Sequence, residues 1–229
     1  MAETDIETIL KRYNPWWHKQ IGLDGINREE YIKKLDKNFS NKQIIFITGL
    51  RRVGKTTIIK QFIYHLIKNK GINEKQILFV TFDDPSLTKF KIPEIIEMFR
   101  TINSIPFGKK IYLFFDEISY KEDFSRELKV INDNQNVKIF ASGSNSLEIA
   151  DKKAFLTGRV FNIKVHPLDF EEYLKFNKLS VSGEDTHLLN SYFEDYLKIG
   201  GMPEYVLTKN PDYLTTIIED IIYKDIARA

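Results

Sequence analysis

The stretch GLRRVGKT at residues 49–56, followed by Thr57, decides the fold of this chain. It fits the pattern G-x-x-x-x-G-K-[ST], in which a glycine-rich loop cradles phosphate groups. The preceding residues Gln43 to Thr48 (QIIFIT) are apolar and rich in β-branched side chains, which predicts a buried parallel strand. Apolar residues then recur at helical spacing from Ile58 to Ile67, which predicts an amphipathic helix. Strand, loop and helix together form the context of a phosphate-binding site rather than of an ordinary turn that carries Gly and Lys.

The residue types of the loop suit this chemistry. Gly49 and Gly54 let the chain approach a ligand closely, and the amides at the start of the helix point at phosphate oxygens. Lys55 is placed to reach the β- and γ-phosphates, and the Thr56 hydroxyl to ligate Mg²⁺. The residues that we expect to contact the nucleotide in this loop are Gly49, Arg51, Arg52, Val53, Gly54, Lys55, Thr56 and Thr57. Of the two arginines, one is expected to touch phosphate and the other to brace the loop.

A second motif supplies carboxylates. The apolar run IYLFF at residues 111–115 reads as a strand and ends in Asp116 and Glu117. Asp116 is expected to hold Mg²⁺ through water, and Glu117 to polarise a water molecule for attack on the γ-phosphate. The alternative is a solvated turn that carries two acids. The adjacent glutamate favours ATP hydrolysis over kinase chemistry, and the lack of an Asn-Lys-x-Asp tetrad weighs against a GTPase.

Three weaker candidates accompany these motifs. Ser142 and Ser144 end another predicted strand, where a hydroxyl can hold the attacking water or the γ-phosphate, unless they form a serine-rich turn. Arg159 is a candidate for stabilising transition-state charge, in cis or from a neighbouring subunit, with a surface salt bridge as the alternative. Trp16 and Trp17 either stack on a base or, as we expect, pack the N-terminal extension onto the core.

The length, charge and amino-acid composition of the chain exclude several classes of function. The chain has 229 residues, a net charge of +2 and no cysteine. The absence of cysteine excludes disulfides, thiolate zinc sites and cysteine catalysis, and the near-neutral charge gives DNA binding little support. No apolar signal core or uncharged stretch of transmembrane length is present, so we expect a cytoplasmic protein without membrane association.

Strand and helix patterns alternate between residues 43 and 165, which predicts a parallel sheet with helices on its faces. The expected strands are Gln43–Thr48, Gln76–Phe82, Lys110–Asp116, Asn136–Ser142 and Val160–Val165. We therefore divide the chain into an N-terminal extension at 1–35, a P-loop ATPase core at 36–166 and a helical lid at 167–229. The last helical pattern has no cap, so we expect the lid to be truncated at its C-terminus.

The motifs together resemble the archaeal-type ATPases of the AAA superfamily. The matching pieces run in the family's order and are NPWW (14–17), GLRRVGKTT (49–57), FDDP (82–85), LFFDEIS (113–119), SGS (142–144), LTGR (156–159), PLDFEEYL (167–174), GGMPEYV (200–206) and EDIIYKDIA (219–227). The resemblance implies a three-layer α/β/α P-loop NTPase fold whose parallel sheet has the order 5-1-4-3-2, followed by a small helical lid. It also implies that longer relatives continue into a winged-helix segment and a further domain.

The chain is also similar to the signal-transducing ATPases that act as nucleotide switches. In those proteins a Gly-x-Pro turn of the lid touches the adenine. Gly201-Met202-Pro203 matches that turn, so the resemblance makes Pro203 a candidate contact to the base. A simple helix–helix turn is the alternative.

The sequence therefore predicts an ATPase that binds ATP and Mg²⁺ and releases ADP and phosphate while changing conformation. The rival hypothesis is a nucleotide-gated interaction or regulatory module with negligible turnover, DNA-associated through a C-terminal domain that lies outside this chain. A homo-oligomer or a protein partner that supplies an arginine is a further candidate partner.

Overall fold

A computed structural model of the chain describes residues 2–144, 156–180, 185–220 and 222. These residues form two compact units. The first comprises Met1–Thr48 and Thr56–Ile163, and the second comprises Gly49–Lys55 and Lys164–Ala229. The predicted three-part division at residues 35 and 166 stays a prediction. No helix among the described residues combines the length and the apolar character that a membrane crossing needs.

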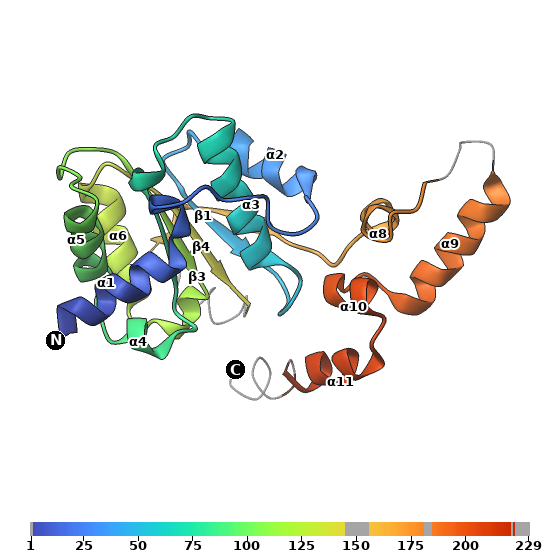
Figure 1. The fold of residues 1–229 in the computed structure, drawn as a ribbon. Coiled ribbons are helices and arrows are strands. Elements are labelled where there is room, and N and C mark those ends of the chain that lie inside the picture. The colour runs from blue at the N-terminus through green and yellow to red at the C-terminus, as the bar shows by residue number, and fades with distance from the viewer. Residues whose placement is uncertain (1, 145–155, 181–184, 221, 223–229) are drawn as a thin grey trace. The chain divides into compact units, whose positions relative to one another are not determined.

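A five-stranded sheet forms the centre of the first unit (Figure 1). Its strands are β1 (Ile44–Thr48), β2 (Ile77–Thr81), β3 (Ile111–Asp116), β4 (Val137–Gly143) and β5 (Val160–Lys164). They lie in the order β2-β3-β4-β1-β5, with parallel pairing of β1 to β4, β4 to β3 and β3 to β2. The predicted order 5-1-4-3-2 is therefore confirmed. The register brings Thr48 opposite Gly143 and Thr81 opposite Asp116, so the carboxyl ends of the strands share one edge.

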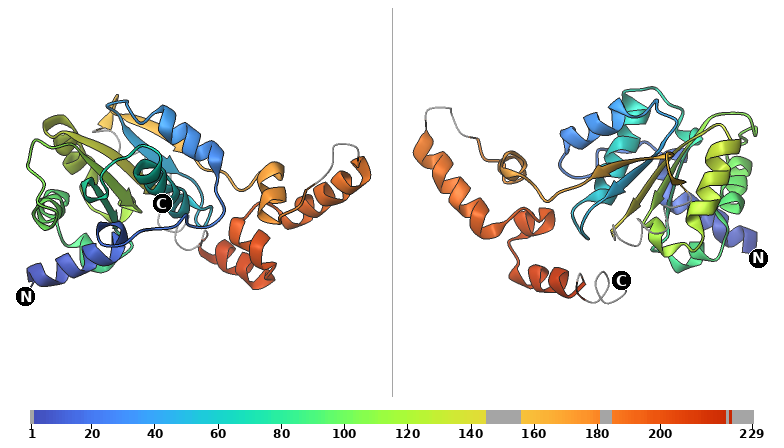
Figure 2. Two further views of the ribbon diagram at one scale, coloured as in Figure 1. Left: turned by 45° about the horizontal axis from the view of Figure 1, so that its top comes forward. Right: turned by 180° about the vertical axis from the view of Figure 1, so that it is seen from behind.

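Helices cover both faces of this sheet, with α2 and α3 on one side and α5 and α6 on the other (Figures 1 and 2). The helical elements of the first unit are α1 (Ala2–Tyr13), η1 (Pro15–Trp17), α2 (Glu29–Lys37), α3 (Lys55–Lys68), η2 (Glu74–Gln76), α4 (Pro85–Thr88), α5 (Ile92–Ile102), η3 (Ile118–Tyr120) and α6 (Phe124–Asn134). Because both faces are covered, β1, β2 and β3 are apolar along most of their length instead of alternating, and every residue of β1 is buried.

Aromatic rings of β3, β4 and α3 pack against one another and hold α3 on the sheet. Phe114 of β3 and Phe140 of β4 stack with their centroids 4.5 Å apart, and Phe62 of α3 meets Phe140 edge-on at 5.3 Å. All three side chains are fully buried. Ring pairs of this kind add about 0.5–1.5 kcal/mol each beyond their area burial. The packing fixes the helix that begins at the P-loop against the strands that carry the acidic residues.

The N-terminal segment covers the open edge of β2. Asn14 is fully buried, and its amide donates to the Phe79 carbonyl at 2.8 Å while its carbonyl accepts from the Phe79 N–H at 2.6 Å. Trp16 and Trp17 are also buried, and both indole N–H groups donate to the Ile77 carbonyl. These contacts satisfy strand groups that an edge would otherwise leave unpaired. The tryptophans thus pack the extension onto the core, and the base-stacking alternative is not seen.

Replacing Asn14 with Ala is expected to lower the free energy of unfolding by roughly 2–4 kcal/mol, because two buried groups of Phe79 lose their partner. Denaturant unfolding followed by circular dichroism measures the change. Asn134→Ala is the matched control, since that exposed side chain donates one hydrogen bond to its own helix. Equal stability of the two variants would show that the extension does not protect the edge.

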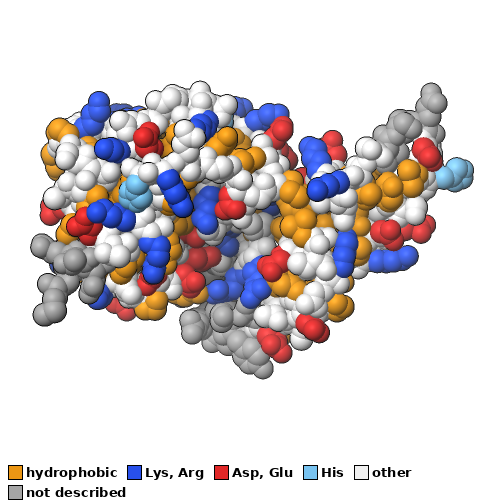
Figure 3. Space-filling view, viewed as in Figure 1, with side chains coloured by type: hydrophobic (Ala, Val, Ile, Leu, Met, Phe, Trp, Pro, Cys, Tyr) orange, Lys and Arg blue, Asp and Glu red, His pale blue; other side chains and the backbone are white. Residues whose placement is uncertain are grey.

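The second unit is helical outside the P-loop. Its helices are α8 (Phe170–Phe176), α9 (Thr186–Ile199), α10 (Pro203–Thr208) and α11 (Pro211–Asp220). Asp169 caps α8 as predicted, accepting from the Glu172 N–H at 2.8 Å. α10 begins at Pro203, the last residue of the predicted turn Gly201-Met202-Pro203, and continues as a helix to Thr208. Phe193 of α9 and Leu207 of α10 are large apolar side chains that are exposed, and Figure 3 shows apolar side chains on the surface of this unit.

Candidate functional site

The P-loop connects the carboxyl end of β1 to the first residue of α3, as the sequence predicts for a phosphate-binding loop. Gly49 follows β1 directly, and a Cβ on it would lie 2.4 Å from the Val165 carbonyl oxygen, so only glycine fits. Arg52 and Gly54 both have positive φ, 61° and 97°, which reverses the chain ahead of the helix. Val53 is fully buried and anchors the loop, leaving its backbone amide as its candidate contact to phosphate.

Lys55 is held close to the loop itself. Its side chain is largely buried, and Nζ donates to the carbonyls of Gly49 at 3.2 Å and Leu50 at 3.1 Å. An ammonium group has three protons, and phosphate oxygens are stronger acceptors for them than neutral carbonyls. The lysine is therefore positioned beside the loop amides where an incoming phosphate can recruit it.

Thr56 and Asp116 meet in the first unit. The Thr56 hydroxyl at the start of α3 donates to Asp116 Oδ2 at 2.7 Å, and Asp116 is the last residue of β3. The carboxylate is 3% exposed, and its other oxygen accepts a hydrogen bond from Ser142. A threonine hydroxyl and a carboxylate are oxygen donors of the kind that Mg²⁺ prefers. The pair thus fits the donor set expected for a Mg²⁺ ion that also binds phosphate oxygens.

Glu117 is fixed by two serines. It adopts a left-handed backbone conformation with φ of 49°, an arrangement that costs energy for a residue with a side chain. Its N–H donates to Ser142 Oγ at 3.2 Å, and its carboxylate accepts from Ser144 Oγ at 2.8 Å. Ser142 lies near the end of β4 and Ser144 directly follows that strand. β4 lies between β1 and β3 in the sheet.

Ser142 and Ser144 therefore contact the acidic pair, a role that the sequence analysis did not consider. The sequence pattern predicts either a contact to water or phosphate or a serine-rich turn. Ser142 is completely buried and bonds to both Asp116 and Glu117, which leaves it a positioning residue in this arrangement. The position of both serines at the carboxyl end of a central strand is the signal that predicts such contacts. A direct contact of either serine to phosphate stays a prediction.

Arg159 lies at the other end of the sheet. Its guanidinium pairs with Asp133 of α6, with Nε 3.0 Å from Oδ1, and it lowers the pKa of that carboxyl by hydrogen bonding. Its carbonyl accepts from the N–H of Ile44, the first residue of β1. Four residue steps of 3.3 Å each, about 13 Å along β1, separate Ile44 from Thr48. The structure thus shows the salt-bridge alternative and does not bring Arg159 to the acidic pair.

Within the second unit, α11 contacts the P-loop. The Arg52 guanidinium lies 5.2 Å from the ring centroid of Tyr213, in the geometry of a cation–π interaction. Burial, together with the Glu204 carboxylate, raises the pKa of Tyr213 to about 12, so its hydroxyl stays protonated. No motif marks Tyr213, and the sequence analysis missed it. Of the two loop arginines, Arg52 therefore contacts a side chain of this same chain, Tyr213, in the structure.

Pro203 is the first residue of α10, where a proline suits the helix start. Gly201 before it approaches the chain ahead of α8 closely. A Cβ on Gly201 would lie 2.2 Å from the Leu168 carbonyl oxygen, and the Gly201 carbonyl accepts from the Leu168 N–H at 2.7 Å. The glycine and proline of this turn thus have a packing role, and a contact of Pro203 with adenine stays a prediction.

Comparison with known proteins agrees with this geometry. The family model described as "AAA domain" matches residues 41–174. A curated protein of Methanocaldococcus jannaschii, described as uncharacterized, is 30% identical over 95% of this chain and 50% of its own length. An uncharacterized protein of Haemophilus influenzae is 28% identical over 88% of this chain and 50% of its own length. The chain thus spans about half the length of the curated relatives it matches.

Solved structures share the fold at low sequence identity. The Walker-type ATPase PABY2304 of Pyrococcus abyssi has a TM-score of 0.52 at 17% identity, covering 87% of this chain and 71% of that one. The Orc1 protein of Aeropyrum pernix, solved in complex with DNA, has a TM-score of 0.53 at 13% identity and covers 84% and 60%. With the AAA model matching more than half of the chain and a P-loop joined to Asp116 through Thr56, this chain belongs to the AAA family of P-loop NTPases.

Proposed function

We propose that this chain binds ATP with Mg²⁺ and hydrolyses it to ADP and phosphate. The observation that carries the proposal is the hydrogen-bonded chain from Thr56 through Asp116 and Ser142 to Glu117. It links the residue after the P-loop lysine to the Asp116 carboxylate and to the backbone N–H of Glu117, whose carboxylate accepts a separate hydrogen bond from Ser144. Binding alone needs the loop and a metal ligand, whereas a second, separately held carboxylate is a feature of hydrolysis.

Each residue has a distinct part in the proposal. Lys55 and the loop amides bind the phosphates, and Thr56 and Asp116 hold Mg²⁺, which when bound neutralises phosphate charge. Glu117 orients a water molecule and accepts its proton. Ser144 holds one oxygen of Glu117 at 2.8 Å, so the carboxylate is aimed before substrate arrives. Because Arg159 of this chain pairs with Asp133, we assign any transition-state arginine to a neighbouring molecule.

Multiple-turnover release of phosphate from ATP tests the proposal. Release is expected to require Mg²⁺ and to stop when EDTA is added, with GTP as the comparison nucleotide. The net charge of +2 gives no reason for DNA to accelerate it, so equal rates with and without DNA are expected. Tight binding of ATP without turnover, with or without DNA, would contradict hydrolysis and favour the second function.

That second function is a nucleotide-gated interaction module, and the contact between Arg52 and Tyr213 favours it. A loop arginine that interacts with either phosphate or a helix makes the position of that helix depend on the nucleotide. The curated relatives are about twice as long as this chain, and the part that they add is a candidate for receiving such a signal. A protein that hydrolyses ATP slowly can still be gated by the bound nucleotide. The two proposed functions therefore differ in the rate of ATP hydrolysis.

Replacing Tyr213 with Leu is expected to raise the affinity for ATP about two- to fivefold. The ring holds Arg52 by a cation–π contact of roughly 0.5–1 kcal/mol, which phosphate must otherwise replace. Leucine fills the buried space without a π face, and Tyr213→Phe, which keeps the ring, is the matched control. Titration with a fluorescent ATP analogue measures both. Unchanged or weaker binding in the leucine variant would show that Arg52 does not exchange between ring and phosphate.

A further inference from the structure

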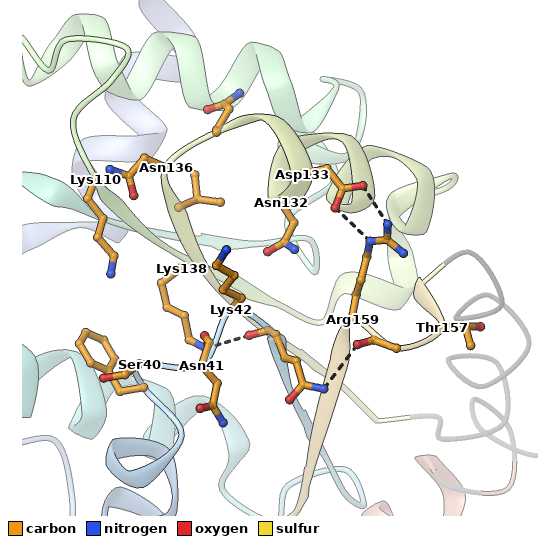
Figure 4. A pocket seen from close by; sticks show the side chains of 15 residues that line it. Ser40, Asn41, Lys42, Lys110, Asn132, Asp133, Asn136, Lys138, Thr157 and Arg159 are labelled. Atoms are coloured by element: carbon orange, nitrogen blue, oxygen red, sulfur yellow. Dashed lines mark hydrogen bonds and ion pairs between the residues drawn. The ribbon is translucent and has the colours of Figure 1, made fainter.

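A pocket of about 820 Å³ lies in the first unit. It is lined by residues at the amino ends of β4 and β5, by those just before β1 and β3, and by the end of α6 (Figure 4). Because the carbonyl of Arg159 pairs with Ile44 at the start of β1, the pocket lies at the opposite end of the sheet from Thr56 and Asp116. It is therefore separate from the Mg²⁺ and hydrolysis residues, and nothing in the proposed function uses it.

The lining carries an excess of positive charge. Lys42, Lys110, Lys138 and Arg159 all line the pocket, and Asp133 is the acidic residue among the lining residues that the structure describes. Asp133 already binds the Arg159 guanidinium through both oxygens, at 3.0 and 3.2 Å. Within the described part of the chain, Lys42 and Lys110 form no ion pair with a carboxylate. Lys42 and Lys110 thus bring two ammonium groups to the pocket without a countercharge, and Lys138 adds a third positive charge at its wall.

The positive charge around the pocket affects the pKa of Lys138. Its side chain is buried, and Nζ donates to the carbonyls of Asn38, Asn41 and Gln43, the last two at 2.6 and 2.8 Å. Burial, and then the charge of Lys110, lower its pKa to about 8. Since its protons are all engaged, Lys138 acts as a fixed charge behind the pocket wall. An anion beside it relieves the repulsion from Lys110.

Most of the other residues that line the pocket are polar. Side-chain amides from Asn132, Gln135 and Asn136 supply hydrogen-bond donors, and Asn132 has no hydrogen-bond partner among the residues the structure describes. Phe39 at one wall is stacked on Tyr112 at 5.5 Å and is half-buried. Figure 4 shows Lys110, Lys138 and Arg159 arranged around the same opening. Amide donors and ammonium groups are suited to phosphate oxygens and poorly suited to an apolar ligand.

We propose that this pocket binds a phosphorylated small molecule, with its phosphate between Lys42 and Lys110. The volume lies in the range of pockets that enclose small ligands. The polar lining and the unbalanced ammonium groups select an anion, and the site operates independently of nucleotide at the P-loop. It gives this NTPase a second ligand position at the amino ends of its strands.

Calorimetric titration with pyrophosphate tests this proposal, in a Lys55→Ala background that removes phosphate binding at the P-loop. Saturable binding with one site per chain is expected, and replacing both Lys42 and Lys110 with Ala should weaken it at least about tenfold. Lys33→Ala is the control, since that lysine is 80% exposed on α2 and pairs with Glu29. In the chain with Lys55 intact, the Lys42 and Lys110 replacements should reduce two pyrophosphate sites to one, which keeps the test valid if Lys55→Ala does not fold.

A second readout follows the Lys138 side chain by NMR. Its ε-methylene signals are expected to shift on addition of pyrophosphate or AMP, and not on addition of chloride at equal ionic strength. Absence of saturable binding, or equal weakening by Lys33→Ala, would overturn the proposal. Binding of a single-stranded oligonucleotide with no binding of pyrophosphate or AMP would also overturn it, because that result assigns the positive charge to nucleic acid.

Discussion

Replacing Glu117 with Gln is expected to reduce steady-state phosphate release by about 10²- to 10⁴-fold, the range that a positioned general base contributes. Glutamine has nearly the same shape, and its amide oxygen can still accept the Ser144 hydrogen bond that holds the glutamate. It cannot accept a proton from water. Binding of ATP and Mg²⁺ is expected to stay within a few-fold of the original, because the proposed metal ligands Thr56 and Asp116 are intact. Phosphate release and nucleotide titration measure the two quantities separately.

Glu122→Gln is the matched control, since it removes the charge of an exposed glutamate shortly after the same strand. Turnover in this variant is expected to equal that of the original chain. Unchanged hydrolysis in Glu117→Gln would remove Glu117 from the mechanism. A parallel loss of ATP binding would show instead that the substitution disturbs the Asp116 site, because Ser142 bonds to both acidic residues.

Replacing Lys55 with Ala is expected to weaken ATP binding about 100-fold or more. In the proposed function the ammonium binds the β- and γ-phosphates, and charge-assisted hydrogen bonds contribute roughly 1.5–3 kcal/mol each. Its loss also leaves the loop amides as the main source of positive potential for a highly charged ligand. Equilibrium titration with a fluorescent ATP analogue measures the change, and circular dichroism confirms that the buried site still folds.

Lys60→Ala supplies the control for this experiment. Lys60 is on the same helix α3 with its side chain 47% exposed, and it lies 3.6 Å from Asp24. Nucleotide affinity in that variant is expected to match the original chain. If Lys55→Ala bound ATP as tightly as Lys60→Ala, the loop would not be the phosphate site, and both proposed functions would fail together.

The local elements could be predicted because their signals are local. The run QIIFIT predicts a strand, and β1 spans Ile44–Thr48; the run QILFVTF predicts another, and β2 spans Ile77–Thr81. Two short helices were not predicted from the sequence. α4 begins at Pro85 and α10 at Pro203, and a proline indicates a turn as readily as a helix start. A four- or six-residue helix has too few turns to show periodicity.

The sheet order was predicted from resemblance to a family and not from any strand alone. Nothing in the composition of β4 tells that it lies between β1 and β3, yet this placement brings Ser142 to Asp116 and Glu117. Parallel pairing joins segments far apart in the chain, so the neighbours of a strand depend on the whole sheet. The serines were therefore found as candidates, while their partners were not.

The amino-acid sequence alone determined the phosphate loop, the strand ending in Asp116 and Glu117, and the helix from Lys55, because each depends on residue type and short-range periodicity. The tertiary structure decided which side chains meet. It placed Arg159 on Asp133 at the amino end of the sheet, and it set Tyr213 against Arg52. It also made Asn14, which the sequence marks only as part of NPWW, the hydrogen-bond partner of the edge strand β2. Such pairs join residues far apart in the chain, and only the packing of sheet and helices brings them into contact.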